Sequence, residues 1–241
     1  MKIYGDTHRG LVRSTNQDCF YFELLTDTSS FAVVCDGMGG ANAGNVASQL
    51  AVQVIKDYLK RAINTKMSSM QIENILRSAL YSANSAVYDF AVKNEDLKGM
   101  GTTVVLLFIY DNTAYILHVG DSRAYMYSGS SLTQLTVDHS MVQSMVDNGQ
   151  ITTEEAKVHP NKNIITRALG VSSEVNADLN IVNLEQDDTL LLCSDGLSNY
   201  VSEEKIVSEL TNFSDKSIDR LIELAIEGGG GDNITAIAVK I

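Results

Sequence analysis

The chain has 241 residues, 44% of them hydrophobic, which is enough to build one sizeable folded domain. A single proline and 17 glycines argue against a fibrous or disordered chain. The formal net charge of −12 disfavours nucleic acid as a partner, because phosphate backbones are bound by clustered Lys and Arg. Three cysteines without a CxxC spacing argue against a disulfide framework and against a structural zinc site.

We expect a cytoplasmic chain that is not inserted into a membrane. No run approaches the roughly 18 apolar residues of a membrane span, and the start MKIYGDTHRG has no apolar signal region. Reduced thiols fit the same compartment. No repeat or linker interrupts the sequence, so we predict one domain over residues 1–241.

The predicted elements alternate between strands and amphipathic helices. A strand beginning at Cys19 and a buried strand at Phe31–Cys35 come first. Apolar residues then recur with helical spacing, and several later runs are apolar on both faces of a strand. The helices are expected within 47–62, 72–90, 203–211 and 216–227, and the further strands within 103–109, 114–119, 124–127, 188–194 and 234–239.

Strands that are apolar on both faces need a cover on each side, which predicts sheets inside and helices outside in a layered α/β or α+β sandwich. Asp111-Asn112 is a plausible hairpin turn between two of these strands. The segment 141–176 is more polar and contains Gly149, Pro160 and only short helical patterns. We expect it to form a mobile excursion near the rim.

Four aspartates mark strand ends, each beside a glycine or another small or turn-forming residue. They are Asp36, Asp121, Asp195 and Asp232. If these ends meet, the carboxylates repel each other unless they are protonated or bridged by cations. Oxygen ligands without a nearby Cys or His pair suit Mg²⁺ or Mn²⁺. A single Asp-Gly is more often a β-turn, but four such sites are harder to explain in that way.

Arg13 lies in the stretch RSTNQD, just before the strand that begins at Cys19. A guanidinium group is well suited to binding a phosphate with two hydrogen bonds. A lone arginine is usually a solvated surface charge, so Arg13 becomes a candidate ligand for phosphate only if the carboxylates lie beside it.

Eight motifs, in order, resemble the metal-dependent protein serine/threonine phosphatases of the PP2C type, bacterial branch. The resemblance spans nearly the whole chain. The motifs are RSTNQD, FAVVCDGMGG, GMGTT (99–103), VGDSRAY (119–125), LTVDHS (135–140), ITRALG (165–170), LLLCSDGLSNYV (190–201) and GGGDNITAI (229–237).

The resemblance implies an α+β fold, a four-layer α-β-β-α sandwich of two antiparallel sheets flanked by helices. It implies hydrolysis of phosphoserine and phosphothreonine on proteins by a water that bridges two Mn²⁺ or Mg²⁺ ions, with a third ion expected nearby. It also implies a flap at about 141–176, a monomer, and a membrane-anchored bacterial Ser/Thr kinase as the opposing enzyme.

The resemblance also implies roles for individual residues. Asp36 would bridge two metal ions with the Gly37 carbonyl as a further ligand, and Asp195 and Asp232 would complete that centre. Asp121 would hold the third ion and share Asp195 with the other two. Arg13 would bind the substrate phosphate, and Asp18 would support the site through metal-bound water. The catalytic group is therefore Asp36, Arg13, Asp195 and Asp232.

Two positions depart from many relatives. Met38 stands where eukaryotic members have a histidine that acts as general acid, so the proton donor to the leaving alcohol stays open, with metal-bound water as the first candidate. Gln17 stands where many relatives have glutamate. Among the histidines, we expect His118 in the core or on the sheet surface and His139 to be solvated or hydrogen-bonded locally.

Two alternatives stay open at this point. A catalytically inactive relative could serve as a binding module, and its signature would be lost metal ligands, whereas all four aspartates and Arg13 are present. An enzyme of the same type could instead act on anti-anti-sigma factors, although such relatives usually carry sensor domains for which this chain has no room.

Overall fold

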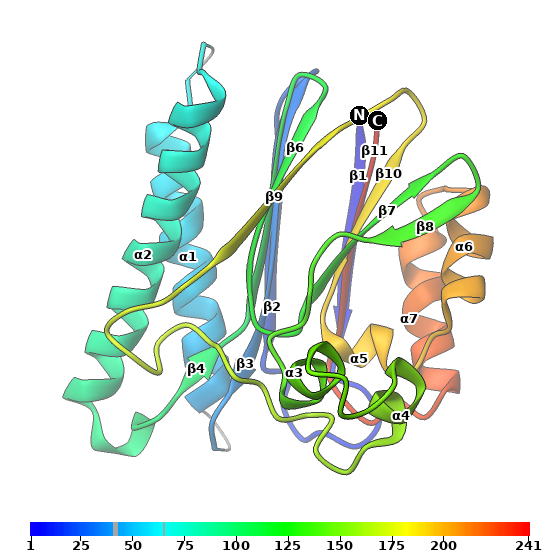
Figure 1. Cartoon of the computed structure of the whole chain (residues 1–241). Helices are drawn as coiled ribbons and strands as arrows, with labels where there is room; N and C mark the ends of the chain where they lie inside the picture. Colours follow the sequence, from blue (N-terminus) through cyan, green and yellow to red (C-terminus); the bar gives the residue numbers. More distant parts are fainter. Residues whose placement is uncertain (41–42, 65) are drawn as a thin grey trace.

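Two antiparallel sheets form the centre of the computed structural model, which describes residues 1–40, 43–64 and 66–241. Helices cover the outer face of each sheet (Figure 1), so the predicted four-layer α+β sandwich is confirmed. One sheet has the order β1-β11-β10-β7-β8, and the other has the order β2-β3-β5-β6-β9 with the short β4 paired to β3.

The strands have the following bounds. The first sheet consists of β1 (Lys2–His8), β11 (Ile234–Lys240), β10 (Thr189–Cys193), β7 (Arg123–Ser128) and β8 (Ser131–Gln134). The second sheet consists of β2 (Asp18–Thr26), β3 (Ser29–Met38), β5 (Val104–Tyr110), β6 (Thr113–Val119) and β9 (Asp178–Asn183), with β4 (Gly101–Thr102) at one end of β3.

The helices fall into an outer layer on each side and a group at one end of the sandwich. The long helices α1 (Ala43–Ala62) and α2 (Ser69–Lys93) cover the second sheet, and α6 (Glu203–Thr211) and α7 (Ser217–Glu227) cover the first. The shorter ones are the 3-10 helix η1 (Glu95–Leu97), α3 (Met141–Asp147), α4 (Thr153–Val158) and α5 (Asp195–Ser198).

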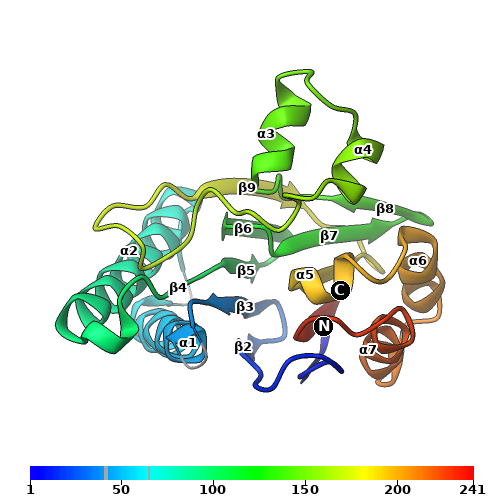
Figure 2. The same cartoon turned by 90° about the horizontal axis from the view of Figure 1, so that it is seen from below.

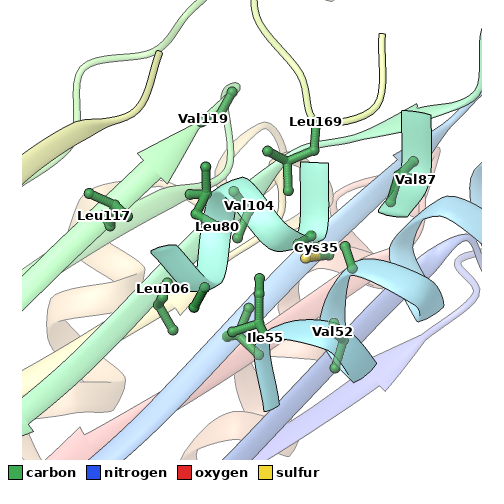
Figure 3. Close-up of a cluster of buried hydrophobic side chains, with 14 of the residues drawn as sticks. Cys35, Val52, Ile55, Leu80, Val87, Val104, Leu106, Leu117, Val119 and Leu169 are labelled. Atoms are coloured by element: carbon green, nitrogen blue, oxygen red, sulfur yellow. The ribbon is translucent and has the colours of Figure 1, made fainter. Parts of the chain in front are cut away.

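Side-chain alternation along β3 decides which way its last residues face. Phe31, Val33 and Cys35 pack into the core under α1 and α2, part of which Figure 3 shows around Cys35. Ala32 and Val34 belong to a second core between the two sheets. Because successive side chains of a strand point to opposite faces, the residue after Cys35 is directed into the space between the sheets.

The structure differs from the sequence expectation in several places, of which three bear on the architecture. β3 does not end before Asp36 but continues to Met38, because Gly37 and Met38 pair with Thr102 and Gly101 of β4. The edge strands β1 and β9 were not predicted, since each alternates between exposed and half-buried residues and lacks a long apolar run. The second long helix begins earlier than its apolar pattern, at a capping box formed by Ser68 and Gln71.

The segment 141–176 carries α3 and α4, which project from the edge of the sheet layers in Figure 2. The two chain termini lie side by side at the opposite end of the sandwich (Figure 1), because β1 and β11 pair from Lys2–Lys240 to His8–Ile234. Within the described ranges, none of the helices is long and apolar enough to cross a membrane.

Candidate functional site

An open pocket of about 470 Å³ gathers most of the residues that the sequence singles out. Its walls come from the loop before β2, the end of β3, the turn after β6, the start of α5 and the approach to β11. The candidate residues among its lining are Arg13, Asp36, Gly37, Asp121, Asp195 and Asp232. Carboxylates from four distant parts of the chain therefore meet in one place.

Asp18 is the one candidate that lies behind the pocket and not in its wall. It pairs directly with Asp36 across β2 and β3 and is only 7% exposed. Its Oδ2 accepts hydrogen bonds from Ser194 Oγ at 2.7 Å and from Thr235 Oγ1 at 2.6 Å. Asp18 is the first residue of β2, whereas Ser194 follows β10 and Thr235 lies on β11, in the other sheet. Asp18 therefore links the two sheets beneath the pocket.

Burial and mutual repulsion raise the pKa values of these acids. The pKa of Asp36 is raised well above its usual range, first by burial and then by Asp18, Asp195 and Asp121. Burial also raises the pKa of Asp121 to about 7, with a further contribution from Asp195. For the same main reason the pKa of Asp18 rises to about 7 and that of Asp195 to about 6. Such a group of acids binds either protons or cations at neutral pH.

The donor set fits a hard divalent cation. Within the described part of the chain, Asp18 Oδ1 and Asp195 Oδ1 are buried without a hydrogen-bond partner. Buried polar atoms are rarely left in that state unless water or an ion meets them. The carboxylates and the neighbouring Gly37 offer oxygen ligands, and all three cysteines lie outside the pocket lining. Oxygen ligands of this kind suit Mg²⁺ or Mn²⁺ better than Zn²⁺.

Arg13 sits at the rim and contacts the acid cluster. Its Nη2 donates to Asp232 Oδ2 at 2.7 Å, and the two side chains are 52% and 26% exposed. The hydrogen bond that Arg13 donates to Asp232 is the main reason why the pKa of Arg13 is raised. The carboxylate cluster therefore does lie beside Arg13, which is the condition set by the sequence for a role in phosphate binding.

Glycine is required at position 37 by a close approach of three backbone segments. A Cβ there would lie 2.0 Å from the Gly44 carbonyl oxygen and 2.7 Å from that of Gln17, too close for any side chain. The Gly37 N–H donates to the same Gln17 carbonyl at 3.1 Å. Gln17 and Met38, the two positions that depart from many relatives, both line the pocket, and Gln17 Nε2 donates to the Gly40 carbonyl at 3.0 Å.

Sequence reasoning did not single out three polar residues that hold the motifs in place. Thr103 Oγ1 accepts from the Asp36 N–H at 3.0 Å and bonds Ser122 Oγ at 2.7 Å. Asn233 Oδ1 accepts from the Gln17 N–H at 2.8 Å. The available signal was position, because all three lie within the motifs, and Ser122 and Asn233 directly follow candidate aspartates.

Asn233 also fixes the loop that carries Arg13. Its Nδ2 donates to the carbonyls of Arg9 at 2.8 Å and Thr15 at 3.0 Å, on either side of Arg13. From the segment 141–176, Asn163 and Ile165 reach the pocket wall. The pocket is therefore bordered by an arginine loop on one side and by this segment on the other.

Comparison with known proteins agrees with this arrangement. The family model described as "Protein phosphatase 2C" matches residues 5–223. The chain belongs to this family of metal-dependent protein serine/threonine phosphatases, so the family resemblance seen in the sequence is confirmed and so is its classification as a phosphatase.

Bacterial serine/threonine phosphatases are among the proteins similar to this chain. The serine/threonine phosphatase Stp of Listeria monocytogenes is 40% identical over 237 residues, which cover 97% of this chain and 93% of the relative. PstP of Mycobacterium tuberculosis is 38% identical over 242 residues, covering all of this chain but 45% of the relative. A structure of the PstP catalytic domain in complex with two manganese ions superposes with a TM-score of 0.85 at 36% identity, over 100% of this chain and 98% of that one.

Proposed function

We propose that this chain hydrolyses phosphoserine and phosphothreonine on proteins at a binuclear Mn²⁺ or Mg²⁺ centre. Asp36, the Gly37 carbonyl, Asp195 and Asp232 are the proposed ligands of that centre. The observation that carries the proposal is the convergence of buried carboxylates in one open pocket. Among the described residues, Asp195 Oδ1 in its wall and Asp18 Oδ1 behind it are buried without a hydrogen-bond partner.

A third ion is part of the proposal. Asp121 would hold it together with Asp195, because both line the same pocket and each raises the pKa of other acids there. Asp18 would hold its neighbours in place through Ser194 and Thr235, with its free Oδ1 directed to metal-bound water.

Bound divalent ions of this kind supply Lewis-acid activation of water and neutralise phosphate charge. The protein supplies position and charge. Arg13 would exchange its contact with Asp232 for the phosphate oxygens of the substrate, since it is the exposed member of that pair. A fixed guanidinium stabilises the charge on the equatorial oxygens during in-line displacement.

No covalent phosphoenzyme is needed for this reaction. Cys35 and Cys193 are fully buried in the hydrophobic cores, where burial raises the pKa of each thiol. A nucleophilic cysteine requires the opposite, an accessible thiol with a lowered pKa. The proton donor to the leaving alcohol is proposed to be water, since Met38 offers no proton.

The proposal extends to the domain organisation, the oligomeric state and the partners of the enzyme. Residues 1–241 would form one phosphatase domain, with the segment 141–176 as a flap that contributes Asn163 and Ile165 to the pocket wall. We propose a cytoplasmic monomer that acts on phosphorylated proteins and opposes a membrane-anchored Ser/Thr kinase. The named bacterial phosphatases among its relatives support this proposal.

Hydrolysis of p-nitrophenyl phosphate and of a phosphothreonine peptide tests the proposal, with Mn²⁺, Mg²⁺ or EDTA in parallel. We expect metal-dependent turnover that is lost in Asp36→Asn and Asp232→Asn. Asp89→Asn is the matched control, because Asp89 is exposed on α2 and outside the pocket lining. Equal turnover in EDTA, or full activity of Asp36→Asn, would contradict the proposed function.

A further inference from the structure

Two buried histidines stack at the end of β6, beside the pocket. His118 lies on β6 and His139 in the motif LTVDHS, and their rings are 4.7 Å apart and nearly parallel at 17°. His118 Nε2 bonds the Val137 carbonyl at 2.9 Å, which fixes its ring. His139 is only 6% exposed, so the expectation that it is solvated or bonded only to near neighbours is wrong.

His139 binds both backbone groups of Gly120, the residue before Asp121. Its own N–H donates to the Gly120 carbonyl at 2.9 Å, and its Nδ1 accepts from the Gly120 N–H at 3.1 Å. Gly120 has a φ of +107°, and a Cβ there would lie 2.6 Å from Thr103 Cγ2. The turn that presents Asp121 is therefore held in an unusual conformation by one side chain 19 residues away.

The opposite edge of the His139 ring faces the segment 141–176 and the start of β9. With Nδ1 acting as acceptor, the neutral ring carries its proton on Nε2, which donates to Asp178 Oδ2 at 3.2 Å. Arg167 Nη1 donates to the other oxygen of Asp178 at 2.9 Å. The Thr166 N–H donates to the His139 carbonyl at 2.8 Å. Thr166 and Arg167 of this segment thus lie around the same histidine that holds Gly120.

The pairing of β6 with β9 sets this geometry. Asp178 is the first residue of β9 and lies directly opposite His118 in the register. The ring of His139 stacks on His118, so it reaches the Asp178 carboxylate from the same face. Arg167 binds the second oxygen of the same carboxylate, next to the His139 ring.

The three groups His118, His139 and Asp178 also lie close enough to hold a metal ion. Two observations disfavour that use. The guanidinium of Arg167 already lies 3.1 Å from His139 Nε2, where it would repel a cation. A metal on Nε2 would also require a proton on Nδ1, directly against the Gly120 N–H. In a hydrogen-bonded chain, Nδ1 accepts from the Gly120 N–H, while Nε2 and Arg167 Nη1 both donate to the Asp178 carboxylate.

We propose that His139 is a positioning residue that couples the segment 141–176 to the Asp121 turn. Contact of Arg167 with Asp178 orients the His139 ring, and the ring in turn fixes Gly120 and the carboxylate that follows it. Motion of this segment would therefore change the affinity of the Asp121 site for its cation. The cation readout rests on the proposed function, whereas the coupling itself does not.

Two substitutions of His139 test the bonds of its two ring nitrogens separately. An asparagine carbonyl reaches about as far as Nδ1, so His139→Asn can keep the bond to Gly120 and lose the link to Asp178. A glutamine amide reaches about as far as Nε2, so His139→Gln does the reverse. Arg167→Met cuts the chain at its outer end, and Asp89→Asn on α2 is again the matched control.

Amide hydrogen exchange at Gly120, measured on the metal-free protein, is the first readout. We expect about tenfold faster exchange in His139→Gln, because the amide loses its acceptor. Arg167→Met should give a smaller increase, and His139→Asn should stay near the wild type. Unchanged exchange at Gly120 in His139→Gln would overturn the proposal.

Calorimetric titration with Mn²⁺ alone is the second readout. We expect the weakest binding step to be about tenfold weaker in His139→Gln, the size of effect seen when a partner of a metal ligand is removed. In the His139→Asn background, Arg167→Met should have no further effect, since the chain is already cut. Effects that multiply in the double variant would show that Arg167 acts independently and would overturn the proposal.

The two readouts separate this proposal from the proposed function. A wild-type protein that neither binds Mn²⁺ nor hydrolyses p-nitrophenyl phosphate would refute the phosphatase, while exchange at Gly120 would still test the coupling. If the His139 variants fail to fold, Arg167→Met and Asp178→Asn replace them, because both side chains are about half exposed. Equally faster exchange at Gly120 in the two single variants, with no further increase in the double variant, supports the proposed coupling. Exchange at the wild-type rate in both single variants overturns the proposal.

Discussion

Two arginine–aspartate pairs near the pocket aspartates are built differently. Arg13–Asp232 lies in the pocket wall, and Arg123–Asp138 lines a neighbouring hollow that shares Asp121 and Asp195. Arg13 meets Asp232 through one contact, Nη2 to Oδ2 at 2.7 Å, and its side chain is 52% exposed. Arg123 meets Asp138 through Nε at 2.9 Å and Nη2 at 2.7 Å, and these side chains are only 27% and 12% exposed. Arg123 Nη1 also donates to Tyr125 Oη at 3.1 Å.

The difference separates a structural pair from an exchangeable one. The Arg123 guanidinium uses all three of its nitrogens on fixed partners. Burial lowers the pKa of Arg123, but the hydrogen bonds and charge interactions with Asp138 and Tyr125 together outweigh burial and raise that pKa. The Arg13 guanidinium has donors left over and lies in the pocket wall. The same two residue types therefore serve stability at one site and are free to bind an incoming anion at the other.

The largest expected effect comes from removing the exchangeable arginine. Arg13→Ala should lower kcat/KM for a phosphothreonine peptide by about 10²–10³, because one fixed donor to the transition-state charge is lost. Its thermal unfolding midpoint should stay close to that of the wild type, since an exposed ion pair contributes little to stability. Steady-state kinetics and thermal unfolding test both halves. A large fall in the midpoint would show that Arg13 is structural after all.

A second test breaks the structural pair. Arg123→Met should lower the free energy of unfolding by about 3 kcal/mol, because it leaves the Asp138 carboxylate largely buried and without its partner. Urea unfolding at pH 7 in EDTA measures the change. The double variant Arg123→Met with Asp138→Asn should recover part of the loss. If Arg123→Met were as stable as the wild type, the conclusion that Arg123–Asp138 is the structural pair would be wrong.

A third test concerns pH and separates the pocket acids from ordinary surface acids. Since the pKa values of Asp18 and Asp121 are raised to about 7, the folded state binds protons between about pH 4 and 7 that the unfolded state has released. Stability in EDTA should therefore fall as pH rises through this window, by roughly 1.4 kcal/mol per pH unit for each proton involved.

Urea midpoints at pH 5 and pH 7.5 measure this slope, with and without Mn²⁺. The ion should flatten it, because a bound cation replaces the protons. A metal-free protein that is more stable at pH 7.5 than at pH 5 would contradict the electrostatic account of the pocket.

Apolar periodicity predicted the helices and the central strands because these elements bury one face or both. It missed β9, whose sequence DLNIVN alternates at a sheet edge and carries no long apolar run. It also ended β3 too early, because the pairing of Gly37 and Met38 with the two-residue β4 leaves no pattern in the sequence.

The site could be anticipated where chemistry and position coincide in one residue. Each of the four pocket aspartates lies beside an apolar strand, and that signal is local. The bonds of Asp18 to Ser194 and Thr235 depend on how two sheets face each other, which no local pattern encodes. His139 was misjudged for the same reason, since its partner Gly120 is brought near by the sheet and the turn that follows it.

The paired ends of β1 and β11 have a practical consequence. Residues 1 and 241 lie together at the end of the sandwich opposite α5 (Figure 1), whereas the first residue of α5 lines the carboxylate pocket. A fluorescent protein, an affinity handle or a tether fused at either end would therefore leave the opening unobstructed. PstP of Mycobacterium tuberculosis, of which this chain matches 45%, shows that the same catalytic unit can be part of a much longer protein.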